Sequence, residues 1–252
     1  MNMIDEPSEP RRPWEEEASN WIKWARTPDH DVFWYYAPAF FEEIVPAAKG
    51  LTLEIGCGEG RVARKLTSGE HNVVALDSSS TLVRSARETD AQSAYLLADA
   101  TALPFAGATF QTVVAYNSLQ TMAMLADMAQ AILEAGRVLK PSGHLCLCVA
   151  HPMTDVGRVK EPSADGELVI SGSYFDHQCV NETATKDSLK MTFHGWTYTL
   201  EDYVRALEEA GFLIERVREP KPSAEHVEQR PSLAGWQRVP LFLFIRAVKR
   251  AS

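Results

Sequence analysis

The sequence predicts an α/β fold whose mostly parallel sheet binds a small ligand where its strands end. An apolar segment at residues 51–55 runs into a glycine-rich turn at 56–60, and apolar residues at helical spacing follow. Three later apolar segments, at 72–76, 95–98 and 110–115, each end in polar residues. Open α/β sheets bind ligands in the crevice at the carboxyl ends of their strands. We therefore expect the site at this edge.

Two aromatic-rich helices are expected before the first strand. Apolar residues repeat at helical spacing from Trp14 to Ala25 and again from Phe33 to Ile44, with a Thr-Pro-Asp break between the two runs. The helices could pack on the sheet as ordinary core, or they could form a lid whose aromatic faces hold a cation. If they form a lid, the residues of interest are Trp24, Arg26, Tyr35 and Tyr36. Residues 1–13 are polar and proline-rich, unlike a signal peptide, and are expected to form a loose tail.

The glycine turn indicates a ligand that is not a dinucleotide. Glycines allow positive φ and close approach to the backbone, and the turn presents free N–H groups at a helix start. The order is G-x-G-x-G, with Arg61 where a dinucleotide site has its third glycine, and no Lys-Ser/Thr pair follows as in a P-loop. Glu54 ends the strand, where its carboxylate would repel a pyrophosphate and attract a cation. A ligand that carries an ammonium and a sulfonium fits better.

Acidic residues end the next two strands. Asp77 is placed to accept hydrogen bonds from two ribose hydroxyls, although a surface acid that caps the next helix is the alternative. Asp99 can accept from an exocyclic adenine amine, with Leu103 or Phe105 over the ring. After the fourth strand, residues 117–119 would line the remaining end of the ligand.

The second half of the chain is expected to interrupt and then complete the sheet. A helix at 127–139 stops at the breaker Lys140-Pro141-Ser142-Gly143, and a strand at 144–150 follows. Residues 151–198 lack a strong helical period, so we interpret them as an inserted cap with short strands at 168–175 and 189–193. Thr199 can cap the next helix. Residues 213–217 and 239–248 then supply two strands, joined by a connection at 219–238. The expected divisions are 1–48, 49–150, 151–198 and 199–252.

Five motifs in this order resemble those of the class I S-adenosylmethionine-dependent methyltransferases, in the group that methylates small molecules and quinone-like compounds. They are LEIGCGEGR at 53–61, ALD at 75–77, LADATALPF at 97–105, FQTVVAYNSL at 110–119 and RVLKPSGHLCL at 137–147. The chain departs from the family pattern at Gln111, where an aspartate is common, and at Ser79-Ser80, where Ser-Pro is frequent. Neither change removes a ligand group.

The resemblance implies a Rossmann-like, seven-stranded sheet with its last strand antiparallel, an N-terminal helical lid and a cap after the fifth strand. It implies that S-adenosylmethionine is the cofactor, S-adenosylhomocysteine the product, and in-line methyl displacement the reaction, with no metal. The acceptor would be a small aromatic or planar molecule, methylated on oxygen, nitrogen or carbon. The expected cofactor-binding residues are Glu54, Gly56, Cys57, Gly58, Asp77, Ser78, Asp99, Ala100, Asn117, Leu119 and Tyr36.

Two histidines are candidate general bases, because a near-neutral imidazole can take a proton from a hydroxyl or amine. His151 follows the fifth strand and His194 ends the cap; for either, the alternative is a purely structural role. An aromatic wall around a flat acceptor could come from Trp24, Tyr116, Tyr174, Trp196 and Tyr198. The D/N-P-P-Y/F motif of amide and base nitrogen methylation does not follow the fourth strand, where Asn117-Ser118-Leu119-Gln120 stands instead.

Composition narrows the classes of partner. The formal charge of −9 argues against a broad nucleic-acid footprint, and no run of eighteen apolar residues predicts a membrane span. Cys146 and Cys148 should share one face of a strand, and the four cysteines favour small buried side chains in a reducing cytoplasm over a zinc site. We expect a cytoplasmic monomer or homodimer with a small-molecule substrate. A non-catalytic scaffold, an NAD-type oxidoreductase and another chemistry on the same fold are the alternatives.

Overall fold

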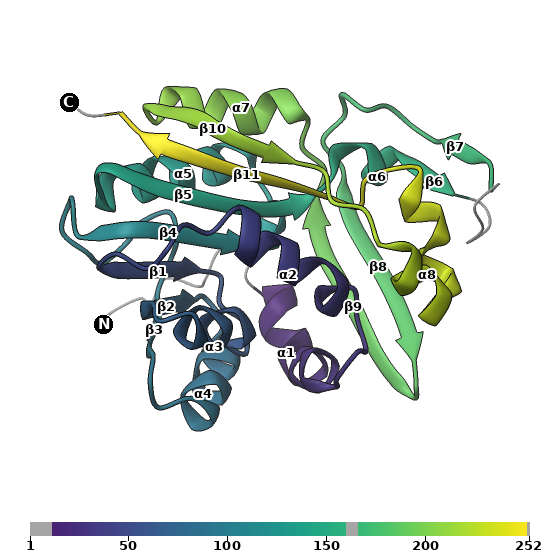
Figure 1. Ribbon diagram of the computed structural model, residues 1–252, viewed down its shortest axis with the longest axis horizontal. Coiled ribbons are helices and arrows are strands. Elements are labelled where there is room, and N and C mark those ends of the chain that lie inside the picture. The colour runs from purple at the N-terminus through teal and green to yellow at the C-terminus, as the bar shows by residue number, and fades with distance from the viewer. Residues whose placement is uncertain (1–11, 160–165, 251–252) are drawn as a thin grey trace, which may run out of the picture.

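The computed structural model describes residues 12–159 and 166–250 and centres on a seven-stranded sheet (Figure 1). The strand order is β10-β11-β5-β4-β1-β2-β3. All neighbours are parallel except β11, which is antiparallel to both β5 and β10. This confirms the expected sheet with its last strand reversed. The strands are β1 Leu51–Ile55, β2 Asn72–Asp77, β3 Ala94–Leu97, β4 Phe110–Tyr116, β5 Leu139–Ala150, β10 Phe212–Arg218 and β11 Phe242–Lys249.

Helices cover both faces of the sheet and bury two cores. One face packs against α5 and α7, at Leu125–Val138 and Leu200–Glu209. The other packs against α2, α3 and α4, at Phe33–Glu43, Arg61–Ser68 and Ser80–Thr89. Side chains alternate along a strand, so in β5 Leu145 and Leu147 enter the first core while Cys146 and Cys148 enter the second. The two cysteines therefore share a face, as expected.

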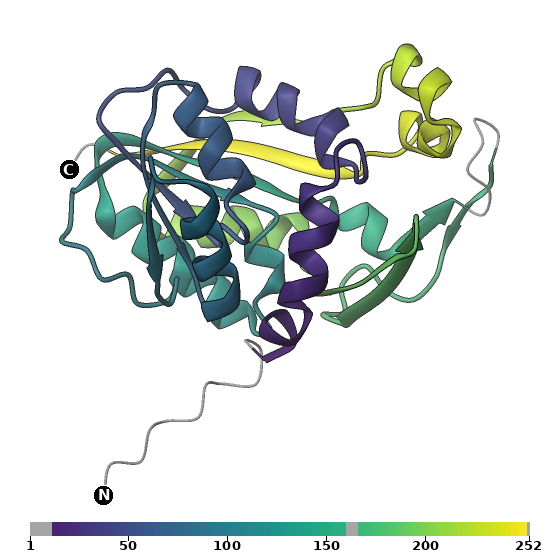
Figure 2. The same cartoon turned by 90° about the horizontal axis from the view of Figure 1, so that it is seen from below.

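The helix α1, Arg12–Arg26, lies between the sheet and an added hairpin (Figure 2). Near its start, the Glu15 carboxylate accepts hydrogen bonds from Ser80 Oγ and Thr81 Oγ1 at the first turn of α4. At its end, Arg26 donates to Glu59 Oε2 at 2.8 Å. Both ends of α1 are thus tied to the sheet domain. In contrast, α2 packs as ordinary core, with Phe40 fully buried.

The segment after β5 leaves the sheet and forms its own short elements. They are α6 Pro152–Val156, β6 Gly157–Val159, β7 Leu168–Ile170, β8 Cys179–Lys186 and β9 Leu189–Trp196. The hairpin β8–β9 turns at Asp187 and Ser188, which both adopt positive φ, as a two-residue type I′ turn requires. The sequence predicted a strand only at the β9 side. The β8 sequence CVNETATK is too polar to signal a strand, because most of it faces solvent.

The connection between β10 and β11, expected only as a link, contains the helix α8 Ala224–Gln229 and the 3₁₀ helix η3 Pro231–Gln237. β11 begins at Phe242, two residues beyond Pro240, and so later than the expected start at 239. The breaker at 140–143 does end α5, yet it lies inside β5 as a bulge, since Phe110 pairs with Leu139 and Thr112 pairs with His144. Thr199 forms the expected cap, reinforced by Asp202.

Candidate active site

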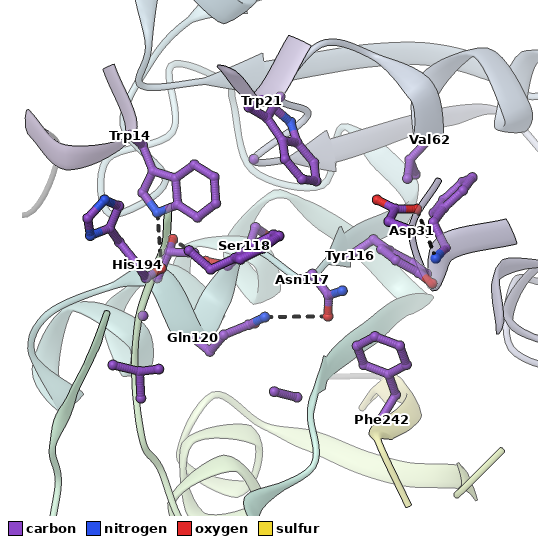
Figure 3. A pocket seen from close by; sticks show the side chains of 18 of the residues that line it. Trp14, Trp21, Asp31, Val62, Tyr116, Asn117, Ser118, Gln120, His194 and Phe242 are labelled. Carbon is purple, nitrogen blue, oxygen red and sulfur yellow. Dashed lines mark hydrogen bonds between the residues drawn. The ribbon is translucent and has the colours of Figure 1, made fainter. Parts of the chain in front are cut away.

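A pocket of about 800 Å³ opens at the carboxyl ends of β1, β2 and β4. One part of its wall is the β1–α3 turn and the residues that end these strands. The other part comes from α1, the α1–α2 loop, the hairpin β8–β9 and η3. Figure 3 shows side chains from both parts, including Trp14, Trp21, Tyr116 and Asn117, arranged around the same space, with the His194 ring on the outer side of Trp14. The pocket is therefore assembled from the sheet and from segments added to it.

The turn after β1 has the backbone that its glycines were expected to permit. Gly56 and Gly58 adopt φ of 71° and 56°, and the Gly56 N–H donates to Leu76 O at 2.8 Å. A Cβ on Gly56 would lie 2.3 Å from Ser118 Cβ, and one on Gly58 would lie 2.9 Å from Trp21 Nε1. A side chain at Gly56 would have to displace Ser118, just after β4, and one at Gly58 would have to displace the Trp21 ring of α1. The glycines thus keep the cradle open and close to the backbone.

Asp77, at the end of β2, is only 8% exposed and lines the pocket. Its Oδ2 accepts from the Gly58 N–H at 2.8 Å, and its Oδ1 accepts from the Ser79 N–H at 2.9 Å. Burial raises the pKa of this carboxyl, while these backbone bonds act in the opposite direction. The sequence offered two roles for Asp77, a ribose ligand and a surface acid that caps the next helix. The structure adds that Asp77 also ties the glycine turn to the start of α4.

Glu54, at the end of β1, is 1% exposed, and its Oε2 has no hydrogen-bond partner among the described residues. It lines the pocket next to the glycine turn. Burial first, and then the charges of Asp77 and Glu59, raise the pKa of Glu54 well above its ordinary value. A buried carboxyl oxygen without a partner is costly unless a cation or hydrogen-bond donor reaches it, even though the backbone of Ala63 donates to this carboxyl. This group fits a ligand that brings a positive charge.

The remaining polar residues expected for the cofactor also line the pocket. Asp99 Oδ1 accepts from the Thr101 N–H at 3.0 Å, which fixes the turn after β3. Asn117 takes a positive φ of 53° directly after β4, and its N–H donates to Cys148 O at 2.7 Å. A non-glycine residue in this conformation is uncommon and clusters at functional sites. The pocket lining also includes Cys57, Ser78 and Ala100.

Two residues expected at the cofactor lie elsewhere. Tyr36 is on the inward face of α2, where its ring packs edge-on against Phe242 at 5.1 Å, outside the pocket lining. Leu119 enters the core shared with α5. Helical spacing could not distinguish the pocket face of the N-terminal helices from the core face, and α1 presents its side chains to the pocket instead. The structure therefore places both side chains outside the pocket lining.

The expected aromatic wall is partly assembled. Trp24, Tyr116 and Trp196 line the pocket. Tyr198 is buried, and its hydroxyl donates to Met122 O. The hydroxyl oxygen of Tyr174 accepts from the Leu200 N–H at 2.9 Å, at the start of α7. Neither tyrosine is part of the lining, because each is engaged at the base of the hairpin. Their place in the wall is taken by residues that the sequence did not single out for it: Trp14, Trp21, Phe33, Phe193, Trp236 and Phe242.

The two candidate bases differ in position. His151 is outside the pocket lining; its Nδ1 accepts from the Met153 N–H at 3.1 Å, and its Nε2 lies 2.9 Å from Glu219 Oε1. Both ring nitrogens are therefore engaged, which opposes a role as base. His194 lines the pocket, and its Nδ1 lies 2.7 Å from Asn181 Oδ1. If Nδ1–H donates to Asn181, Nε2 keeps a lone pair.

Arg61 and His30 also line the pocket. Arg61 donates to Asp31 Oδ2 at 2.7 Å, and its guanidinium lies over the rings of Trp21 and Phe33 at 4.8 and 4.1 Å. This pair joins the cofactor turn to the α1–α2 loop. His30 is 1% exposed, and burial and the Lys186 charge lower its pKa. The sequence marked Arg61 only as a departure from the dinucleotide pattern and gave no signal for His30.

The comparisons agree with this geometry. Residues 53–147 match the family described as "Methyltransferase domain". A solved S-adenosylmethionine-dependent methyltransferase from Mesorhizobium loti has the same fold, with a TM-score of 0.68 at 23% identity over 88% of this chain and 99% of that one. Residues 53–147 therefore match a methyltransferase domain, and the chain has the fold of a solved S-adenosylmethionine-dependent methyltransferase, which confirms the resemblance. S-adenosylmethionine is the cofactor of this class of domain.

Two named relatives are similar over a large part of the chain. The malonyl-[acyl-carrier protein] O-methyltransferase of Erwinia pyrifoliae is 34% identical over 151 residues, which are 59% of this chain and 55% of the relative. The 27-O-demethylrifamycin SV methyltransferase of Amycolatopsis mediterranei is 29% identical over 176 residues, 63% of this chain and 64% of the relative. The chain thus spans about half the length of the first relative, and about a third, 35%, of the Salmonella typhimurium protein of the same name.

The residues present fit S-adenosylmethionine. The orphaned Oε2 of Glu54 has acceptor capacity for the ammonium of its methionine part. The Gly56 and Gly58 cradle, which a Cβ would fill, admits a ligand against the backbone. Asp77 keeps acceptor capacity for ribose hydroxyls, because each carboxylate oxygen accepts more than one hydrogen bond. Asp99 occupies the position expected to accept from the adenine amine.

Proposed function

We propose that this chain transfers the methyl group of S-adenosylmethionine to a small, planar organic acceptor. The observation that carries this proposal is the unpartnered Glu54 Oε2, which lines the same pocket as the glycine cradle and Asp77. A buried acceptor of this kind suits a cationic nucleoside and would oppose a pyrophosphate. Bound S-adenosylmethionine would supply a methyl group on a sulfonium sulfur. The leaving group of the transfer would be the neutral thioether, S-adenosylhomocysteine.

The protein's own contribution is to align the acceptor and exclude water. The aromatic side chains of α1 and β9, including Trp24 and Phe193, wall the space next to the cofactor half. Aromatic faces of this kind bury flat organic molecules and leave little room for water. The acceptor is therefore held as a plane between these walls, with its nucleophilic atom directed towards the methyl group.

His194 is the general base in this proposal. It is among the lining residues, and its Nδ1–H hydrogen bond to Asn181 leaves Nε2 as an acceptor, although the ring lies on the outer side of Trp14 (Figure 3) and must turn past it to reach the acceptor. We expect His194→Ala to lower kcat by about 10²–10⁴-fold for a hydroxyl or amine acceptor, with cofactor affinity unchanged. Asn181→Ala should cause a smaller loss of the same kind. If His194→Ala kept the kcat of the unaltered protein from pH 6 to 9, His194 would not be a general base.

The candidate methyl acceptors to be tested as substrates should include free planar compounds and acids linked to a carrier protein. The name of the Erwinia pyrifoliae relative gives it an acceptor joined to a carrier protein, and that of the Amycolatopsis mediterranei relative gives it a rifamycin precursor. Among residues 12–159 and 166–250, no helix combines the length and apolar character that a membrane crossing requires. A monomer or homodimer that acts on a small molecule remains part of the proposal.

The decisive experiment compares S-adenosylmethionine with NAD. At a hundredfold excess over Kd, a ligand stabilises the folded state by roughly 2.7 kcal/mol, which raises Tm by about 5–10 °C for a chain of this size. We expect this rise with S-adenosylmethionine and S-adenosylhomocysteine, and none with NAD. Formation of S-adenosylhomocysteine with the candidate acceptors then separates an enzyme from a non-catalytic binding protein. A rise with NAD alone would refute the proposal.

A further inference from the structure

Arg230 lies in the pocket wall at the junction of α8 and η3, in the connection between β10 and β11. Its Nη1 donates to the backbone oxygen of His30 at 3.4 Å, and its guanidinium lies 5.6 Å from the centre of the Tyr35 ring. These contacts hold the side chain against the α1–α2 loop. They use one of its five N–H donors.

No carboxylate in the described part of the chain forms an ion pair with Arg230. The other pocket-lining arginine, Arg61, is paired with Asp31 at 2.7 Å and enclosed by two aromatic rings. Charges that line a partly closed, aromatic pocket are ordinarily paired, since desolvation penalises a lone charge. Arg230 thus differs from Arg61 in having its charge available to the pocket.

A second cation lies close to Arg230. Lys186, at the tip of the hairpin β8–β9, donates from Nζ to the same His30 oxygen at 2.6 Å. The charge of Arg230 contributes, after burial, to a lowered pKa of Lys186. The carboxylates of Asp187, Asp31 and Asp29 act on Lys186 in the opposite direction. The Asp187 side chain is 72% exposed, and Asp31 is engaged by Arg61. Two cations therefore share one neutral acceptor, an arrangement that a bound anion would stabilise.

We propose that Arg230 forms an anion subsite, so that the acceptor is a planar molecule bearing a carboxylate or phosphate group that pairs with this guanidinium. The inference rests on the proposed function for the identity of the pocket as an acceptor site. A planar guanidinium matches both anions with two parallel N–H···O bonds, and such charge-assisted pairs are stronger than neutral hydrogen bonds. The aromatic walls supply area for binding, and Arg230 fixes the orientation of the acceptor.

The test uses three probes of one shape on the protein saturated with S-adenosylhomocysteine: 2-naphthoate, 2-naphthyl phosphate and the neutral 2-naphthamide. We expect at least one anion to bind about tenfold or more tightly than the amide, the size of one charge-assisted hydrogen bond. The comparison between naphthoate and naphthyl phosphate identifies the preferred anion. In Arg230→Gln the preference should fall to within about twofold while amide binding is unchanged, and Arg230→Lys should retain part of it.

The matched control is Arg238→Gln, an arginine of the same connection that lies outside the pocket lining. It should keep the full preference. Equal binding of the three probes by the unaltered protein, failure of both anions to bind, or an undiminished preference in Arg230→Gln would each overturn the subsite. Affinity for S-adenosylhomocysteine is measured separately in every variant. If the unaltered protein does not bind S-adenosylhomocysteine, that result counts against the proposed function. The three probes can then be tested on the protein without cofactor, so that the anion preference of Arg230 is judged independently.

Discussion

The two halves of the pocket are built in different ways. The half that we propose for the cofactor comes from Glu54, Asp77 and Asn117, which end neighbouring strands and lie within about seventy residues of one another in the sequence. Backbone hydrogen bonds hold it, such as that from Gly58 N–H to Asp77. The acceptor half comes from segments up to two hundred residues apart, as in the contact between Arg230 and His30. Its walls are side chains, so they can change without disturbing the sheet.

The largest effect should come from closing the cradle. Gly56→Ala places a Cβ 2.3 Å from Ser118 Cβ at a φ of 71°, so we expect S-adenosylhomocysteine binding to be lost by calorimetry. The matched control is Gly211→Ala, which has a φ of 80° and open space around it. That variant should lose about 1 kcal/mol of stability and keep its cofactor affinity. If Gly56→Ala bound S-adenosylhomocysteine with normal affinity, the glycine turn would not be the cofactor site, and the division of the pocket into two halves would be wrong.

Asp77→Asn should give the next largest effect. The amide cannot accept at both positions, so the bonds from Gly58 and Ser79 are weakened together with those to the ribose. Hydrogen bonds to charged groups contribute roughly 1.5–3 kcal/mol each, so cofactor affinity should fall at least about tenfold. The Tm of the free protein should fall as well. A fall in Tm with unchanged cofactor affinity would mean that Asp77 only holds the glycine turn and does not bind the ribose.

Glu54→Gln should separate binding from stability. The pKa of Glu54 is raised in the folded protein, so the stability linked to this group is complete below its ordinary pKa and is lost as pH rises through the folded value. At pH 8 the variant without cofactor should therefore be at least as stable as the unaltered protein, with the difference shrinking towards pH 5. Affinity for S-adenosylmethionine should nevertheless fall by about tenfold. We expect the stability of Glu54→Gln, relative to the unaltered protein, to increase from pH 5 to pH 8. A decrease over this range would contradict the account.

A change in the acceptor half should leave the cofactor half intact. Trp236 lines the pocket from η3, outside the sheet. Trp236→Ala removes aromatic area, so we expect KM for a planar acceptor to rise by about tenfold. The Kd of S-adenosylhomocysteine should stay within about twofold. Equal losses of both affinities would mean that the halves are coupled.

The smallest effect is expected at His151. It caps the Met153 N–H and contacts Glu219 outside the pocket lining. His151→Ala should reduce stability by about 1 kcal/mol, as loss of a helix cap does, and leave kcat within about twofold. Urea unfolding and steady-state kinetics measure the two quantities. A hundredfold loss of kcat would restore His151 as a candidate base.

The same comparison explains what the sequence could predict. The sheet and the pocket-lining residues at its strand ends follow from local signals, because a strand, a glycine turn and a terminal acid such as Asp77 are adjacent in the chain. The hairpin strand β8 and Arg230 carry no such signal, since polar exposed residues resemble a loop until distant segments pack on them. Tyr36 and Trp21 show the limit for helices. Spacing predicted both helices, but only packing determined which aromatic side chains reach the pocket.

The most direct test of the account is a crystal structure with S-adenosylhomocysteine. The account predicts its ribose on Asp77, its ammonium within hydrogen-bond distance of Glu54, and its sulfur facing the space walled by Trp24, Phe193 and Trp196. An empty cradle in saturated crystals, or a nucleoside stacked among those aromatic rings with both carboxylates turned away, would contradict it.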